Sequence, residues 1–173
     1  MKEKIIRGKA WVFGDEINSD VMAPGIYFKE SMDVMASHCL EAIDPLFAKE
    51  VKPGDIVVAG RNFGVGSARE QAALAFKELK VGAIIAKSYA RIFYRNALNF
   101  GLPALVYNST SEIKPKDELL IDPVKGELKN LTTKIHINVS PIPEHLMDMI
   151  SSGGLMPFLR KKIDDGEIKV RKE

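Results

Sequence analysis

The sequence has 173 residues, of which 46% are hydrophobic and 28% charged, as expected for a globular domain with its own core. Its 25 basic and 23 acidic residues leave a net charge of +2, which gives no electrostatic basis for binding nucleic acid. No apolar stretch reaches the length of about 18 residues that a membrane span needs, and residues 1–4 lead into a strand-like run instead of a signal peptide. We therefore expect one domain over residues 1–173, a cytoplasmic location, and neither membrane nor nucleic acid among its partners.

The sequence contains a single cysteine, Cys39, and three histidines. One cysteine forms no disulfide framework and supplies no set of thiolates for an iron–sulfur cluster. The histidines, His38, His136 and His145, lack the spacing of metal ligands. We therefore expect no metal site in this chain, and we interpret Cys39 as a buried, unreactive thiol in a helical region.

Short apolar runs and helical patterns alternate along the first two thirds of the chain. The run Ile56-Val57-Val58-Ala59 is typical of a strand that is buried on both faces. The order of the elements implies a parallel sheet with right-handed crossovers. Strands are predicted over 5–13, 56–59, 81–86 and 104–107, and helices within 31–50 and over 67–79 and 88–99, the last capped by Ser88.

The last third of the chain has a different pattern. Residues 134–139 alternate apolar and polar side chains, and with 119–121 they predict antiparallel strands in a second, smaller sheet. Short helices are expected over 144–150 and 155–159, followed by a charged tail. The predicted fold class is therefore α/β, with a parallel βαβαβ core and a smaller second sheet.

A glycine-rich turn over residues 60–69 joins the buried strand to the next helix. Open α/β sheets bind their ligands at such turns. Gly64 and Gly66 allow backbone conformations that other residues disfavour, and they let a ligand approach the main chain. The turn is therefore the first candidate for a functional site.

Two other interpretations of this turn depend on its spacing. Ser67 and Glu70 fit a capping box, so a purely structural cap at the helix start stays open. A nucleotide-binding motif fits less well, because Arg69 stands where the dinucleotide fingerprint has a third small residue and no Gly-Lys-Ser/Thr follows.

Four segments in one order carry a more specific signal. They are Asp15-Glu16-Ile17-Asn18-Ser19-Asp20, Asn62-Phe63-Gly64-Val65-Gly66-Ser67-Ala68-Arg69-Glu70, Ala86-Lys87-Ser88-Tyr89-Ala90-Arg91-Ile92-Phe93-Tyr94-Arg95-Asn96, and Gly101-Leu102-Pro103. Together they resemble the small subunit of 3-isopropylmalate dehydratase, the swivelling-domain partner in the aconitase superfamily. The resemblance implies a swivelling-type β/β/α domain.

The resemblance also implies an activity, that of a hydro-lyase acting on a small hydroxy di- or tricarboxylic acid. It makes Ser67 the catalytic base, and it makes Arg69 and the backbone at Ala68 ligands of substrate carboxylates. The Lewis acid is then one iron of a 4Fe–4S cluster on a separate large subunit, with no cofactor in this chain. Supporting positions are expected at Asn18, Asp20, Asn62, Gly64, Gly66 and Glu70.

Energetics indicate that Ser67 needs help from outside the chain. Deprotonating a serine that lies about six pKa units above neutrality costs about 8 kcal/mol. A helix N-terminus contributes about 0.3–2 kcal/mol, and a cation such as Arg69 lowers a neighbouring pKa by about 1–3 units. Several kcal/mol are still missing, so we expect a second polypeptide to complete the site.

The loop over residues 24–30 bears on the substrate, because in the resembled family this loop covers the substrate's distinguishing group. Tyr27 and Phe28 offer aromatic surface for an isopropyl group, whereas Lys29 offers a cation for the extra carboxylate of a homoaconitase-type substrate. Isopropylmalate interconversion in leucine biosynthesis is the first expectation, and a homoaconitase-like or methyl-substituted malate dehydratase is the alternative. The family commonly has serine at Ala68 and histidine at Gln71, and these departures bear on substrate identity.

Interpretations from other classes stay open. A non-catalytic module that binds phosphate or nucleotide predicts a harmless Ser67→Ala change, and a structural adaptor predicts full activity after Arg69→Ala. Arg91 and Arg95 share one helix face, which is either solvated or in contact with the partner subunit or an acidic ligand. Self-association of the isolated chain into a homo-oligomer through the partner's surface also stays open.

Overall fold

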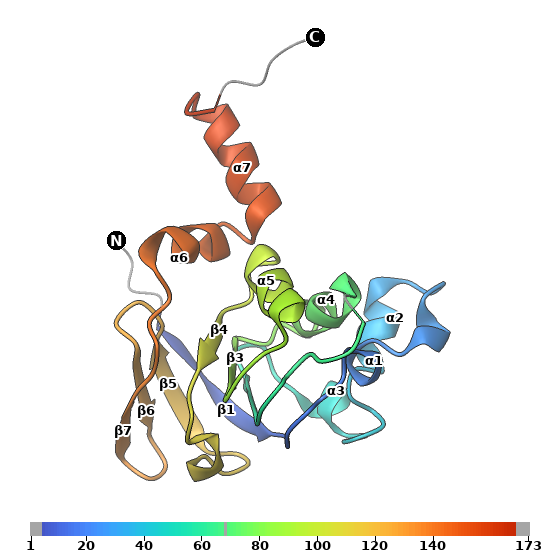
Figure 1. Ribbon diagram of the computed structural model, residues 1–173, viewed down its shortest axis with the longest axis vertical. Helices are drawn as coiled ribbons and strands as arrows, with labels where there is room; N and C mark the ends of the chain where they lie inside the picture. Colours follow the sequence, from blue (N-terminus) through green and yellow to red (C-terminus); the bar gives the residue numbers. More distant parts are fainter. Residues whose placement is uncertain (1–4, 68, 169–173) are drawn as a thin grey trace.

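A computed structural model describes residues 5–67 and 69–168. One seven-stranded sheet runs through the molecule in the order β4-β3-β2-β1-β5-β6-β7 (Figure 1). The strands are β1 (Ile6–Val12), β2 (Ile56–Ala59), β3 (Ala83–Ala86), β4 (Ala104–Val106), β5 (Glu118–Asp122), β6 (Glu127–Asn130) and β7 (Ile135–Asn138). The helices are α1 (Ser19–Met22), α2 (Met32–Ser37), α3 (Phe47–Glu50), α4 (Glu70–Glu78), α5 (Arg91–Asn99), α6 (Glu144–Ser151) and α7 (Leu155–Asp164), with 3₁₀ turns η1 (Gly25–Tyr27) and η2 (Thr110–Glu112).

The half of the sheet from β1 to β4 is parallel, as the alternation of strands and helices predicts. Every residue of β2 and β3 is buried. The helices α4 and α5 form the crossovers and pack against each other (Figure 1). Because β2, β3 and β4 run parallel, the turns that follow β2 and β3 lie at the same edge of the sheet.

The strand β1 belongs to both halves of the sheet. Its residues 10–12 pair in parallel with β2, and its residues 6–9 pair antiparallel with β5. A Cβ atom at Gly8 would lie 2.1 Å from the carbonyl oxygen of Gly54, so only glycine fits where the two halves meet. The predicted smaller sheet is therefore present and is continuous with the parallel core through β1.

The strand β6 is absent from the sequence prediction. Its four residues contain one apolar side chain, Leu128, which is too few for a period-2 pattern to be recognised. Asn130 anchors the strand, since its side-chain amide donates to Asp117 at 2.6 Å and its oxygen accepts from the backbone of Thr132 and Thr133. The strand depends on pairing with both neighbours more than on its own sequence.

A cluster of phenylalanines joins the helices to the sheet below the glycine turn. Phe63, within the turn, is fully buried and packs against Phe76 of α4 and Phe93 of α5, with ring centroids 5.9 and 5.2 Å apart. Phe76 also contacts Phe47 of α3. These rings pack the turn against the core and so fix the position of the backbone that leads from Phe63 to Ser67.

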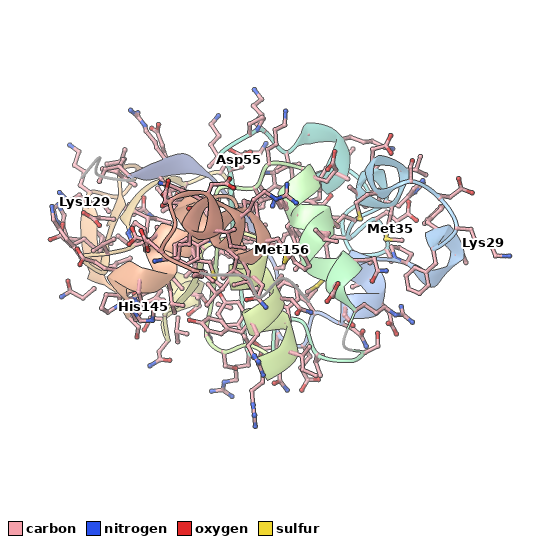
Figure 2. The ribbon with its side chains drawn as sticks, turned by 90° about the horizontal axis from the view of Figure 1, so that it is seen from above. Lys29, Met35, Asp55, Lys129, His145 and Met156 are labelled. Atoms are coloured by element: carbon pink, nitrogen blue, oxygen red, sulfur yellow. The ribbon has the colours of Figure 1, made fainter. Side chains whose placement is uncertain are left out.

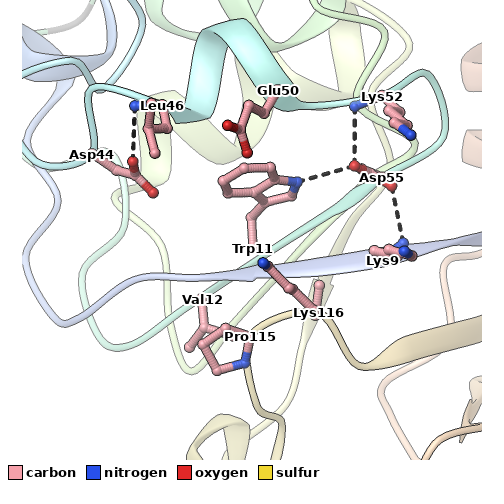
Figure 3. Close-up of a pocket in the computed structure, with 11 residues that line it drawn as sticks. Lys9, Trp11, Val12, Asp44, Leu46, Glu50, Lys52, Asp55, Pro115 and Lys116 are labelled. Atoms are coloured by element: carbon pink, nitrogen blue, oxygen red, sulfur yellow. Dashed lines mark hydrogen bonds between the residues drawn. The ribbon is translucent and has the colours of Figure 1, made fainter.

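A buried carboxylate, that of Asp55, lies beside β1, and it is not one of the predicted site residues. Asp55 is buried at the start of β2 and accepts hydrogen bonds from the backbone of Lys9 and Lys52 and from the indole of Trp11, each at 3.0 Å (Figure 3). It borders a hollow of about 410 Å³. Because its carboxylate is occupied by these bonds, we interpret Asp55 as an anchor between β1 and β2.

The C-terminal segment departs from the expected charged tail. The helix α7 continues from the predicted residues 155–159 to Asp164, and it projects away from the sheet (Figure 1). Within residues 5–67 and 69–168, no helix has both the length and the apolar character to cross a bilayer.

Candidate functional site

The glycine turn lies between two neighbouring segments of the chain. Phe63 forms a bridge to Tyr89, and Val65 forms a bridge to Asn18. The backbone amide of Gly64 donates to Ile17 at 2.9 Å. These pairings bring the Asp15–Asp20 segment, which the sequence analysis included only by resemblance, directly alongside the turn.

Gly64 and Gly66 are required by the geometry of the turn. Gly64 has φ +81°, and a Cβ atom there would lie 2.2 Å from the ring of Phe93. Gly66 has φ +107°, and a Cβ atom there would lie 2.4 Å from the side-chain oxygen of Asn18. Any other residue at either position is strained and collides with its neighbour.

The hydroxyl of Ser67 is exposed and points to a carboxylate. Ser67 Oγ donates to Asp20 Oδ1 at 3.2 Å and lies 3.4 Å from Ser19 Oγ. The capping box that the spacing left open is not formed, because α4 begins at Glu70 with Arg69 in the cap position and no side chain bonds to the cap. The positive φ of Gly66 and the contact with Asp20 turn Ser67 away from the helix end, so its side chain is available for chemistry.

Ser19 is a residue of the site that the sequence analysis missed. It is buried, and its hydroxyl donates to the carbonyl oxygen of Ser67 at 2.8 Å. Its backbone amide donates to Val65, also at 2.8 Å. The available signal was its place between Asn18 and Asp20 in the segment that carries the resemblance. Ser19 therefore fixes the main chain at Ser67 through a buried hydrogen bond.

Asp20 and Arg69 form an ion pair beside this serine. The guanidinium Nη1 of Arg69 lies 2.7 Å from Asp20 Oδ1, the same oxygen that accepts from Ser67. Asn18 caps α1 by accepting from the backbone amide of Asp20 at 2.8 Å. Because the pair is partly exposed, it contributes about 0–1 kcal/mol to stability, and its main effect is on the positions of the two charges.

The two aromatic side chains of the loop over residues 24–30 contact different residues. Phe28 lies under the guanidinium of Arg69, 4.5 Å from ring centroid to Cζ. Tyr27 instead stacks on His38, with centroids 3.8 Å apart. Ile26 is 80% exposed, and Lys29 extends from one end of the molecule (Figure 2). The structure thus brings Phe28 to the site and turns Tyr27 toward α2.

The remaining predicted positions lie around the turn. Asn62 has φ +59°, and its backbone amide donates to the hydroxyl of Ser88 at 2.9 Å. Ser88 therefore does not cap α5, whose cap position is Ala90. Glu70 is exposed in the first turn of α4. The predicted position Ala68 lies outside the described residues.

The side chains of the described residues do not fit an iron–sulfur cluster. Cys39 is fully buried, and burial raises the pKa of its thiol, whereas cluster ligands are thiolates. Among residues 5–67 and 69–168, no group of three or more His, Cys, Asp or Glu side chains is placed to hold a metal ion. A resident metal centre therefore has no ligand set in this part of the chain.

A hollow of about 370 Å³ opens between the turn and α5. Ser67 lines it together with Arg91 and Arg95, the two arginines that share a helix face. The site thus combines an exposed hydroxyl, a carboxylate and an ion-paired guanidinium on one side with a basic helix on the other. The first side comes from α1 and from the turn that leads into α4, and the second from α5, which packs next to α4 (Figure 1).

The fold and the turn define the class of protein, an α/β domain of the swivelling type found in the aconitase superfamily. The family model for the aconitase C-terminal domain matches residues 17–110. The chain therefore belongs to this family, in the group of small subunits of 3-isopropylmalate dehydratase and related enzymes.

Three relatives place the chain within the family. The 3-isopropylmalate dehydratase small subunit 2 of Archaeoglobus fulgidus is 48% identical over 165 residues, 94% of this chain and 98% of the relative. The methanogen homoaconitase small subunit of Methanothermobacter thermautotrophicus is 46% identical, covering 95% of this chain and 96% of the relative. The crystal structure of 3-isopropylmalate dehydratase from Methanocaldococcus jannaschii has a TM-score of 0.87 and 42% identity, covering 95% of this chain and 99% of that chain.

Proposed function

We propose that this chain is the small subunit of a 3-isopropylmalate dehydratase, which interconverts 2-isopropylmalate and 3-isopropylmalate by dehydration and rehydration. The observation that supports this most directly is the exposed Ser67 hydroxyl at the edge of an open hollow, where it donates to a carboxylate that is itself paired with the cation Arg69. A general base needs such a position, because it must approach a proton on the substrate.

In the proposed reaction, the Ser67 hydroxyl first loses its own proton to solvent, and the resulting alkoxide takes the proton from the carbon next to a substrate carboxylate and becomes a neutral hydroxyl again. The electron pair of that C–H bond forms the double bond, and the hydroxyl leaves from the adjacent carbon. Return of water with the opposite regiochemistry gives the isomer. A 4Fe–4S cluster on the large subunit supplies the Lewis acid for the departing hydroxyl, and the acid groups are also expected there.

The neighbours of Ser67 have separate roles in this scheme. Arg69 binds a substrate carboxylate with the donors that its pairing with Asp20 leaves free. Asp20 holds both side chains in the resting subunit. A Ser67 alkoxide beside the Asp20 carboxylate is disfavoured by like charge, so we expect substrate and the large subunit to separate these two groups on closing.

The substrate depends on the loop over residues 24–30. Ile26 and Phe28 present exposed apolar surface, which favours an isopropyl group. Lys29 presents a cation, which favours the additional carboxylate of a homoaconitase-type substrate. We take isopropylmalate as the substrate because the apolar ring of Phe28 lies against Arg69, and we keep a homoaconitase-like or methyl-substituted malate dehydratase as the alternative.

The test is reconstitution with a candidate cluster-bearing large subunit, followed by assays on isopropylmalate, homoaconitate and citramalate. We expect activity only from the mixture, with the highest kcat/KM on isopropylmalate. Ser67→Ala should lower kcat by about 10²–10⁴-fold without weakening assembly. A mixture that assembles but dehydrates none of the three acids, or a fully active Ser67→Ala variant, would contradict the proposal.

A further inference from the structure

Three cations on α5 and on the segment before it line one hollow. Arg91 and Arg95 are exposed on the helix, and Lys87 is half-buried in the segment that leads into it from β3. In the described part of the chain, none of the three side chains forms an ion pair. We call Lys87, Arg91 and Arg95 the basic edge.

The basic edge surrounds a hollow of about 430 Å³ with an apolar floor. The floor is formed by Tyr89, Tyr94 and Val106. The hydroxyl of Tyr89 bonds to the carbonyl oxygens of Ile84 and Leu105 at 3.0 and 2.8 Å, which fixes its ring between two strands. Burial raises the pKa of Tyr89 and of Tyr94, so both rings are neutral. The hollow is therefore rigid, uncharged at its base and positive at its rim.

This hollow is connected to the proposed reaction site through the same two arginines. Arg91 and Arg95 also line the hollow that contains Ser67. Ile92, which lies beside Ser67 in that second hollow, is 52% exposed. None of the described residues that line either hollow is acidic. The charged side chains that line the two hollows are thus all cations, and apolar lining extends from the Ser67 hollow across α5.

We infer that this surface is where the large subunit docks, through an acidic patch that meets the basic edge and an apolar side chain that fills the Tyr89–Tyr94 hollow. The inference rests on the proposed function, because that function requires a second subunit to reach Ser67. Docking here brings the partner to the rim of the Ser67 hollow, where its catalytic groups are needed. Charge complementarity at the rim accelerates association and sets the orientation of the partner.

A small acid is a poorer occupant of the same surface. The cations extend over two hollows on either side of Arg91 and Arg95, and the Tyr89–Tyr94 floor contributes apolar contact that a carboxylate does not use. Arg69, the proposed ligand of substrate carboxylates, lines neither hollow. An extended surface with an exposed isoleucine between arginines has the composition of a protein interface, in which apolar contacts are surrounded by charge.

The experiment compares two double variants with the same change in charge. In R91E/R95E the two arginines of the basic edge are reversed, and in K129E/K134E the reversal is on β6 and on the residue before β7, away from α5; Figure 2 labels Lys129 at one end of the molecule. For each, the Kd for the large subunit is measured at low and high salt, and the substrate KM is measured with the large subunit saturating. R91Q/R95Q is a milder variant, and thermal unfolding confirms that each protein folds.

We expect R91E/R95E to raise the Kd by about tenfold or more at low salt and to reduce its salt dependence, with R91Q/R95Q intermediate and K129E/K134E unchanged. With the large subunit saturating, the substrate KM should change by a smaller factor than the Kd. An unchanged Kd overturns the inference, as does a raised KM with an unchanged Kd, since the arginines then bind substrate. Neither result touches the proposed function, which fails if the wild-type mixture is inactive or if Ser67→Ala is fully active.

Discussion

Asp20 and Ser67 are 47 positions apart in the chain, yet the hydroxyl of Ser67 donates to the carboxylate of Asp20 at 3.2 Å. The same oxygen of Asp20 binds the guanidinium of Arg69 at 2.7 Å. One exposed carboxylate therefore sets the resting position of the proposed base and of the proposed substrate ligand. This arrangement makes Asp20 the side chain whose removal should disturb both.

Asp20→Ala should lower kcat by about 10- to 100-fold, because Ser67 and Arg69 lose a common anchor and small displacements of reacting groups are costly. Its effect on unfolding should stay below about 1 kcal/mol, since the pair is partly exposed. Asp20→Asn retains a hydrogen-bond acceptor without the charge, so it separates the two contributions. Steady-state kinetics and urea unfolding of the reconstituted enzyme and the free subunit give both quantities. Wild-type kinetics for both variants would remove Asp20 from the site.

Ser19→Ala removes the hydroxyl that holds the Ser67 carbonyl. Because Ser19 is buried and the carbonyl oxygen then loses its partner, we expect a loss of about 1–2 kcal/mol in the free energy of unfolding. We also expect a lower kcat. Ser37→Ala is the matched control, since the exposed Ser37 hydroxyl also donates to a carbonyl oxygen, that of Val34, away from the site. Equal small effects from the two changes would show that Ser19 has no special positioning role.

Gly66→Ala adds only a methyl group, yet it should lower both the free energy of unfolding and the activity. The added methyl group meets Asn18 at 2.4 Å, and the φ of +107° is unfavourable for alanine, so we expect about 1–3 kcal/mol of destabilisation and a large loss of activity. Gly14→Ala is the control, because a Cβ atom at Gly14 meets nothing within 4 Å. Urea unfolding and kcat should separate the two variants. Similar behaviour of both would mean that the turn rearranges freely.

The sequence predicts the parallel half of the fold because its signals are local. The buried strand 56–59 is bounded as predicted, and the first strand and the strands at β3 and β4 are found with slightly different ends. The strand β6 was missed because its stability comes from two neighbours and from Asn130, not from its own pattern.

The site was predictable only in part, because some of its residues are held by contacts with distant parts of the chain and not by local patterns. The glycine turn follows from two local patterns, a buried strand and a helix. Ser67 fits a capping motif in the local sequence but does not cap α4 in the structure. Its hydroxyl instead bonds to Asp20, a residue distant in the chain, which no local pattern predicts. Ser19 has no local signature at all, since its partner is a carbonyl oxygen 48 positions away.

Cys39 should make the stability of the free subunit depend on pH in the alkaline range. Burial raises the pKa of its thiol, so the folded chain keeps the proton when the unfolded chain, with a thiol pKa of about 8.5, releases it. Because the unfolded state then binds fewer protons, the free energy of unfolding is fully retained below this pH and falls as pH rises above it. Between pH 8.5 and 9.5 the loss from this group is about 1 kcal/mol. Urea unfolding at the two pH values should give that excess loss for the wild type over Cys39→Ala, and parallel behaviour would show that the thiol is accessible.

Lys29 tests which substrate the loop selects. If its cation binds an additional carboxylate, Lys29→Val should lower kcat/KM for homoaconitate by about 10- to 100-fold, as expected for a lost charge-assisted hydrogen bond. The same change should leave kcat/KM for isopropylmalate unchanged or higher, because an isopropyl group prefers apolar surface beside Ile26 and Phe28. Lys129→Val at the opposite end of the molecule is the control (Figure 2). A parallel fall for both substrates would assign Lys29 to the structure of the loop, and selection would then rest on Ile26 and Phe28.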